Sequence, residues 1–153
     1  MNSAAGRFRR AVALTVVGGG MLLGHEARPS VDSVAVTAEG FRDDGGQAGC
    51  AVFSSGQGFP KDIAKALVRR FVRIERKSAS CSVDGLRPGV YPVVVFHDAN
   101  ANGVVDTNFL GMPTEGIGVS RDARGRFGPP SFADAAFRYD GGVVRVPVSV
   151  HYL

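Results

Sequence analysis

The sequence predicts a mainly β protein: an antiparallel β-sandwich of the immunoglobulin or transthyretin type, with one short helix and a long functional loop. Short runs alternate apolar with polar residues, which is typical of strands that bury one face. Turn-forming residues separate these runs at regular spacing, and Gly is frequent, at 21 residues. Helical spacing of apolar residues is confined to one short segment, which disfavours a helix bundle.

Six segments have the alternation expected of strands. They are residues 33–41, 48–54, 70–76, 79–86, 90–98 and 141–153. The fifth segment is the clearest, and its alternation places Val93, Val95 and His97 on one face and Asp98 on the other. In the last segment, Pro147 cannot donate a backbone hydrogen bond, so we expect an edge strand or a bulge there.

One segment has the spacing of a helix instead. Its apolar residues lie four positions apart, at Ile63, Leu67 and Phe71. Because Pro60 occupies what would be a first helical position, we predict a short helix over about residues 60–68. Further along the chain, Ser131 and Asp134 have the spacing of a capping box that opens one turn of helix.

A long loop is predicted from residue 97 to residue 131, because Gly, Pro, Asn and Asp dominate this stretch. Loops of such length are uncommon in compact domains and are usually functional or disordered. The loop opens with HDANANGVVDTN. Oxygen-bearing side chains recur there at alternate positions, at Asp98, Asn100 and Asn102, and Gly103 follows where a sharp bend is required.

This spacing matches the first nine positions of an EF-hand-type calcium loop, D-x-N-x-N-G-x-x-D. The expected ligands are Asp98, Asn100, Asn102, the backbone carbonyl of Val104, and Asp106. Phe109 stands where an EF-hand has its bidentate Glu, and a strand precedes the loop, so no EF-hand helix pair is predicted. Glu115 is the best candidate to complete the set of oxygen ligands around the ion. With two or three carboxylates, we expect a dissociation constant of about 10⁻⁴ to 10⁻³ M, as in extracellular modules.

An alternative organisation of the same loop needs no ion. Asn and Asp are ordinary turn residues, and a stack of Asx-turns could close the loop through hydrogen bonds alone. The spacing, together with an exported compartment rich in calcium, favours Ca²⁺ as the cofactor.

The first 27 residues have the features of a secretory signal peptide, because three arginines precede an apolar stretch too short to span a bilayer comfortably. Cleavage after Ala27 would leave a polar linker at residues 28–32 and one β-sandwich domain at residues 33–153. His25 stands where a small residue is preferred, so the cleavage site stays open. We expect a periplasmic or secreted protein with no membrane span after processing.

The charge of the chain gives no support to a nucleic-acid partner. The formal net charge of +4 reflects 18 basic and 14 acidic residues, and loss of residues 1–27 removes three Arg and one Glu, leaving 15 and 13. Four further arginines alternate with or flank apolar residues, which predicts a solvated strand face rather than a binding patch. They are Arg69, Arg70, Arg73 and Arg76.

The chain contains two cysteines, Cys50 and Cys81. In an oxidising compartment they could form one disulfide that closes a loop of about 30 residues and contributes roughly 3 to 4 kcal/mol. Two unlinked buried thiols are the alternative, and the sequence does not decide between them. The pair lacks the spacing of a zinc site.

The stretch GVYPVVVFHDANANGVVDTNFLGMPTEGIGVS, followed by FGPPSFADAAF, resembles the signature of a bacterial exported family known as domain of unknown function 2141. The resemblance covers about residues 33–153 and implies a small secreted β-rich domain without an established activity. The matching positions are His97, Asp98, Asn100, Asn102, Gly103, Asp106, Asn108, Gly111, Pro113, Glu115, Gly118 and Ser120. Pro92 stands where the family commonly has Ala.

Three functions from different classes follow from these observations. The leading hypothesis is an exported, non-enzymatic β-sandwich module with a calcium-organised loop, which binds an envelope protein, a glycan or a small ligand, or serves in envelope assembly. The second is a small hydrolase-type enzyme that uses His97 and Glu115 as an acid–base pair in a pocket roofed by Phe132. The third is a structural envelope subunit that presents the edge strand near Pro147. The sequence lacks the G-x-S-x-G, H-E-x-x-H and Walker A motifs.

Overall fold

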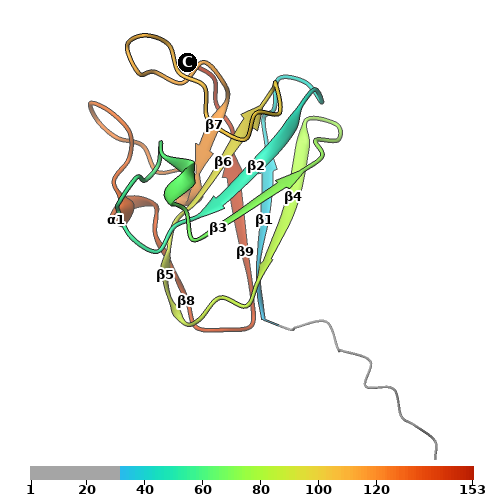
Figure 1. Ribbon diagram of the computed structural model, residues 1–153. Helices are drawn as coiled ribbons and strands as arrows, with labels where there is room; N and C mark the ends of the chain where they lie inside the picture. The colour runs from blue at the N-terminus through green and yellow to red at the C-terminus, as the bar shows by residue number, and fades with distance from the viewer. Residues whose placement is uncertain (1–31) are drawn as a thin grey trace, which may run out of the picture.

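The computed structural model describes residues 32–153, which form nine strands and one short α-helix (Figure 1). The predicted signal peptide, residues 1–27, and all but the last residue of the predicted linker lie outside the described residues. Within residues 32–153, no helix is long and apolar enough to cross a membrane.

The strands form three sheets. The first sheet has the order β4 (Ser78–Asp84), β1 (Ser33–Glu39), β9 (Val143–Ser149). The second has the order β3 (Val68–Val72), β2 (Gln47–Val52), β6 (Val93–Asp98), β7 (Ile117–Val119). The third pairs β5 (Gly89–Tyr91) with β8 (Phe137–Tyr139), and the helix α1 (Phe132–Ala135) immediately precedes β8.

The two larger sheets pack face to face, and their inward-facing side chains form the main hydrophobic core. Val34 and Val36 come from β1, and Val93 and Val95 come from β6. This arrangement confirms the predicted β-sandwich class. One strand pair departs from an all-antiparallel pattern, because β1 and β9 run parallel to each other. Strands β2 to β8 lie between β1 and β9 in the sequence, so no hairpin turn determines the relative direction of these two strands.

Strand β6 is buried on both of its faces, which explains its near-continuous apolar sequence. Val93 and Val95 face the main core, as the alternation predicts. Val94 and Phe96 face a second hydrophobic cluster on the other side of the sheet, where Phe132 of α1 packs against it. Strand β6 therefore leads from the centre of the protein directly into the polar loop.

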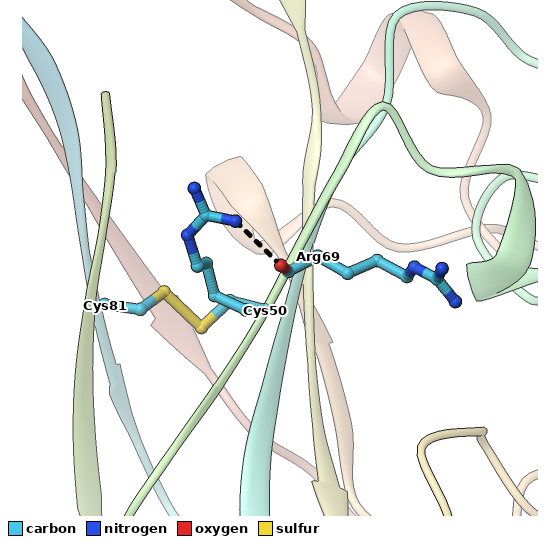
Figure 2. The surroundings of a disulfide bond; sticks show 4 residues. Cys50, Arg69 and Cys81 are labelled. Carbon is cyan, nitrogen blue, oxygen red and sulfur yellow. Dashed lines mark hydrogen bonds between the residues drawn. A yellow bond between two sulfur atoms is a disulfide. The ribbon is translucent and has the colours of Figure 1, made fainter. Parts of the chain in front are cut away.

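The disulfide between Cys50 and Cys81 ties the two large sheets together (Figure 2). Cys50 lies on β2 and Cys81 on β4, and both side chains are buried in the main core. The structure therefore selects the disulfide over two unlinked thiols. On the neighbouring strand β3, the side chain of Arg69 points away from the disulfide, and the guanidinium of Arg70 donates a hydrogen bond to the backbone carbonyl of Arg69 (3.1 Å).

The prediction of a helix over residues 60–68 is wrong. This segment contains only a single 3₁₀ turn, Ile63–Lys65, and β3 begins at Val68. The backbone N–H of Leu67 already bonds to the carbonyl of Val52 on the neighbouring strand (2.8 Å), so pairing with the sheet ends the helical turn. Ile63 is buried, whereas Leu67 is 53% exposed and Phe71 is 40% exposed. The spacing of these residues therefore does not reflect one buried helix face.

Two other boundaries differ from the prediction. Residues 90–98 belong to two strands, β5 and β6, which separate at Pro92 because proline has no N–H for a continuous ladder. The predicted loop from 97 to 131 is interrupted by β7, which pairs with β6. Two local predictions are confirmed. Ser131 caps α1 by accepting the N–H of Asp134 (3.2 Å), and Pro147 lies in β9, an edge strand of the first sheet.

Candidate functional site

The polar loop connects the end of β6 to the start of β7 and occupies residues 99–116 (Figure 1, top, gold to orange). Its first turn is built around Asp98, the last residue of β6, whose side chain is completely buried. Its two carboxylate oxygens accept hydrogen bonds from the backbone N–H of Asn102 (2.9 Å), the backbone N–H of Gly103 (2.8 Å) and the side-chain amide of Gln47 (2.7 Å). Gly103 has a positive φ of 80°, which glycine adopts without strain. Asp98 therefore determines where the chain bends.

Three of the predicted ligands converge above this bend. The side-chain amides of Asn100 and Asn102 both donate to the carboxylate of Asp106, at 2.7 Å and at 2.9 to 3.1 Å. The amide oxygen of Asn100 accepts the N–H of Asn102 (3.2 Å), and that of Asn102 accepts the N–H of Val104 (3.0 Å). These are Asx-turns, so hydrogen bonds alone can close the loop in the way the alternative interpretation requires.

Glu115 lies at the other end of the loop and is buried, with 8% of its surface exposed. One carboxylate oxygen accepts the N–H of Ala99 (2.8 Å), and the other accepts the N–H of Asp106 (3.1 Å). Glu115 therefore holds the beginning and the middle of the loop together. In the part of the chain that the structure describes, no three His, Cys, Asp or Glu side chains gather closely enough to hold a metal ion by themselves. A cation here would also need oxygens from Asn and from the backbone.

His97 is buried on the opposite face of β6 from Asp98 and links three separate segments. Its Nε2 lies 2.8 Å from the carbonyl oxygen of Gly45, which can only accept, so Nε2 carries the hydrogen of the neutral ring. Its Nδ1 then accepts the hydroxyl hydrogen of Tyr152 (2.7 Å), and that hydroxyl oxygen accepts the N–H of Arg42 (2.8 Å). Both ring nitrogens are thus committed to structural hydrogen bonds.

The structure does not join His97 and Glu115, the two residues of the enzymatic hypothesis. No hydrogen bond or ion pair connects them, and each makes its contacts elsewhere. The register of β6 and β7 pairs Phe96 with Ile117, and its continuation puts Glu115 opposite Asp98. Because cross-strand partners share a face, Glu115 and His97 lie on different sides of the sheet.

A protein-family model matches residues 36–147, from β1 through most of β9 and including the entire loop. This model describes an uncharacterized protein conserved in bacteria, DUF2141. The chain belongs to the DUF2141 family. This confirms the resemblance seen in the sequence. Comparisons with curated proteins and with solved structures found no significant match.

Two polar residues of this DUF2141 protein bond to the two ends of β6, and the sequence patterns assign them no role. Gln47 on β2 donates to Asp98 from the neighbouring strand. Ser120 is fully buried just after β7, where its hydroxyl accepts the N–H of Val93 (2.9 Å) and donates to the carbonyl of Ala135 (2.6 Å). The only sequence signal for Ser120 is its place in the family pattern.

The Tyr152→Phe substitution should lower the free energy of unfolding of this DUF2141 protein by about 1 to 3 kcal/mol. It leaves the Nδ1 of the buried His97 ring without its partner, and a buried polar group without a partner carries a cost of this size. The N–H of Arg42 also loses its acceptor, but Arg42 is exposed and water can replace it. Urea denaturation would measure the change. The Tyr91→Phe variant is the matched control, since within residues 32–153 the Tyr91 hydroxyl bonds only to the carbonyl of Arg87. Equal stability of wild type and Tyr152→Phe would contradict a structural role for the His97 network.

Proposed function

We propose that this DUF2141 protein is an exported, non-enzymatic binding module whose loop between β6 and β7 holds a Ca²⁺ ion. The observation that carries the proposal is the convergence of Asn100 and Asn102 on the carboxylate of Asp106, above the buried carboxylate of Asp98. A hard cation that takes six to eight oxygens fits such a mixture of carboxylate, amide and backbone oxygens.

The ligands would be Asp98, Asn100, Asn102, the carbonyl of Val104, and Asp106. Three donors occupy the Asp98 carboxylate, which has about four acceptor positions, so one position is available. The two Asn side chains direct their NH₂ groups at Asp106, and a half-turn of each amide would direct the oxygen there instead. Glu115 supports the site by holding the N–H of Asp106.

The hydrogen bonds that such rotations break limit the affinity. Each Asn would give up its bond to Asp106 and its Asx-turn bond to a backbone N–H. We therefore expect a dissociation constant of about 10⁻⁴ to 10⁻³ M, the range of extracellular calcium modules. Such weak binding suits a compartment where calcium is abundant.

Export is supported by the basic and apolar sequence at the start of the chain and by the disulfide. Disulfides persist in oxidising compartments and are rare in the reducing cytosol. The binding function is supported by the separate structural contacts of His97 and Glu115, which leave the hydrolase hypothesis without a paired acid and base. An envelope protein, a glycan or a small ligand is the partner class.

Calcium should raise the stability of the chelator-treated protein. At 10 mM CaCl₂, about ten to a hundred times the expected dissociation constant, the free energy of unfolding should rise by about 1.4 to 2.7 kcal/mol. Calorimetric titration would measure the binding, and the melting temperature would report the stabilisation. The Asp106→Ala variant should lose both effects, since it removes the carboxylate on which the amides converge.

The Asp62→Asn variant is the matched control, because Asp62 is an exposed carboxylate whose salt-bridge partner is Lys65, outside the loop. It should retain the full response to calcium. A titration without heat, together with an unchanged melting temperature, would contradict the calcium site and favour closure by Asx-turns alone. Equal responses of Asp106→Ala and wild type would place any bound ion elsewhere.

A further inference from the structure

A cavity of about 460 Å³ lies between the second half of the polar loop (residues 110–113), residues 122–130 and the end of the chain after β9. Its wall is predominantly apolar and includes Leu110, Met112, Pro113, Val119, Pro129 and Leu153. Cavities that hold small molecules typically measure about 300 to 1,000 Å³ and have mostly apolar walls with a few polar groups. The size and the lining therefore fit a small organic ligand.

The charged groups of the cavity favour an anion. Lys61 and Arg124 both line it, and neither forms an ion pair with an acidic side chain of residues 32–153. The guanidinium of Arg124 lies 3.2 Å from Nε2 of His151, and the ammonium of Lys61 lies 3.5 Å from the carbonyl of Gly111. Both cations thus have donor hydrogens left for a ligand.

The single acidic side chain among the described lining residues is Asp122. One of its oxygens accepts the backbone N–H of Ser149 (3.1 Å), which ties Asp122 to the end of β9. The cavity lining therefore carries two cationic side chains and one carboxylate, and the carboxylate already has a structural partner.

Exposed apolar side chains concentrate around the same cavity. Five large hydrophobic residues on its lining segments or directly next to them are at least 45% exposed: Phe109, Leu110, Met112, Phe127 and Leu153. Single exposed apolar residues are common on protein surfaces, whereas their concentration around one cavity marks a binding site. Burying such surface stabilises a complex by about 25 cal/mol per Å².

We propose that this cavity binds an amphipathic carboxylate, a small molecule with an extended apolar body and a single carboxylate head, such as a medium-chain fatty acid. The planar guanidinium of Arg124 matches the two oxygens of a carboxylate, and Lys61 adds a second positive charge. The apolar body of the ligand lies against Leu110, Met112 and Val119. This ligand site is separate from the proposed calcium site at residues 98–106, and binding there does not require the ion.

The wall formed by residues 110–113 has its own hydrogen bonds. The side-chain oxygen of Asn108 accepts the N–H groups of Leu110 (2.9 Å) and Met112 (3.0 Å). The N–H of Asn108 in turn bonds to the carbonyl of Met112 (2.9 Å). This turn can therefore present its apolar side chains whether or not calcium occupies the first half of the same loop.

Titration of the full chain with dodecanoate in the presence of EDTA tests the proposal, with displacement of the fluorescent anion 8-anilinonaphthalene-1-sulfonate as readout. Dodecanoate should bind at least about tenfold more tightly than dodecanol, which has the same chain without the charge. The double variant Lys61→Gln/Arg124→Gln should lose at least about tenfold in dodecanoate affinity and keep its affinity for dodecanol.

The matched control is Arg69→Gln/Arg70→Gln, which removes two exposed positive charges from β3, away from the cavity lining. Its affinity for dodecanoate should stay within about twofold of wild type. The proposal is overturned if dodecanoate does not bind, if dodecanol binds as tightly, or if both double variants lose the same affinity. Because EDTA is present throughout, failure here leaves the calcium proposal intact, and failure of calcium binding leaves this one intact.

Discussion

Replacing Cys50 and Cys81 together by Ala should lower the free energy of unfolding by about 3 to 4 kcal/mol. The two cysteines lie 31 residues apart, and a cross-link of that span restricts the unfolded chain by about this amount. The disulfide also connects β2 of one sheet to β4 of the other, so the two layers would lose this covalent link between them. Urea denaturation would measure the loss, and the melting temperature should fall by about 10 °C or more.

Reduction supplies the control for this prediction. Dithiothreitol should bring the wild-type protein close to the stability of the Cys50→Ala/Cys81→Ala variant and should leave the variant itself unchanged. Since both sulfurs are buried, reduction should proceed faster in mild denaturant. If the variant unfolds at the same urea concentration as the oxidised wild type, the cross-link does not stabilise the sandwich.

The Asp98→Ala substitution should have an effect of similar size, lowering the free energy of unfolding by about 3 to 5 kcal/mol in EDTA. It removes the acceptor of three hydrogen bonds at a fully buried position, and bonds to a charged acceptor are worth about 1.5 to 3 kcal/mol each without being additive. Urea denaturation measures the global effect. Hydrogen exchange at the amides of Asn102 and Gly103 measures the local one, and both should lose protection.

The Asp106→Ala variant is the matched control for Asp98, because Asp106 lies in the same loop but is only half-buried and accepts from side chains rather than from the backbone turn. Without calcium, Asp106→Ala should lower the free energy of unfolding by less than about 1.5 kcal/mol. Equal losses for the two variants would show that Asp98 is not the residue that holds the bend. Together with the calcium titration, the pair of variants separates the carboxylate that holds the bend from the carboxylate on which the two amides converge.

Features that depend on neighbours in the chain could be predicted from sequence. The two faces of β6 follow from the alternation of Val93, Val95 and His97 with their neighbours, because successive side chains of a strand point in opposite directions. The cap of α1 follows from Ser131 and Asp134, which need only one turn of backbone to meet. The bend after Asp98 follows in the same way from closely spaced Asn, Asp and Gly residues.

Features that depend on distant partners could not be predicted. The three residues Ile117–Val119 form β7 because they pair with β6. The segment after Pro60 changes from a helical turn to a strand because the N–H of Leu67 bonds to the carbonyl of Val52 and Val68 pairs with Val52. The parallel direction of β1 and β9 also has no local signal. The helix or strand propensity of a short segment is too weak to determine its structure when such tertiary contacts favour another one.

The sequence by itself determined the mainly β class, the family, the faces of the central strand and the position of the polar loop, because period, turn chemistry and spacing are local properties. Only the tertiary structure decided that Cys50 meets Cys81, that His97 meets Tyr152, and that Lys61 and Arg124 line one cavity. The members of these three pairs are 31, 55 and 63 positions apart in the chain, and the sequence carries no measure of distance in space. The packing of the two sheets against each other brings the members of these pairs together in space.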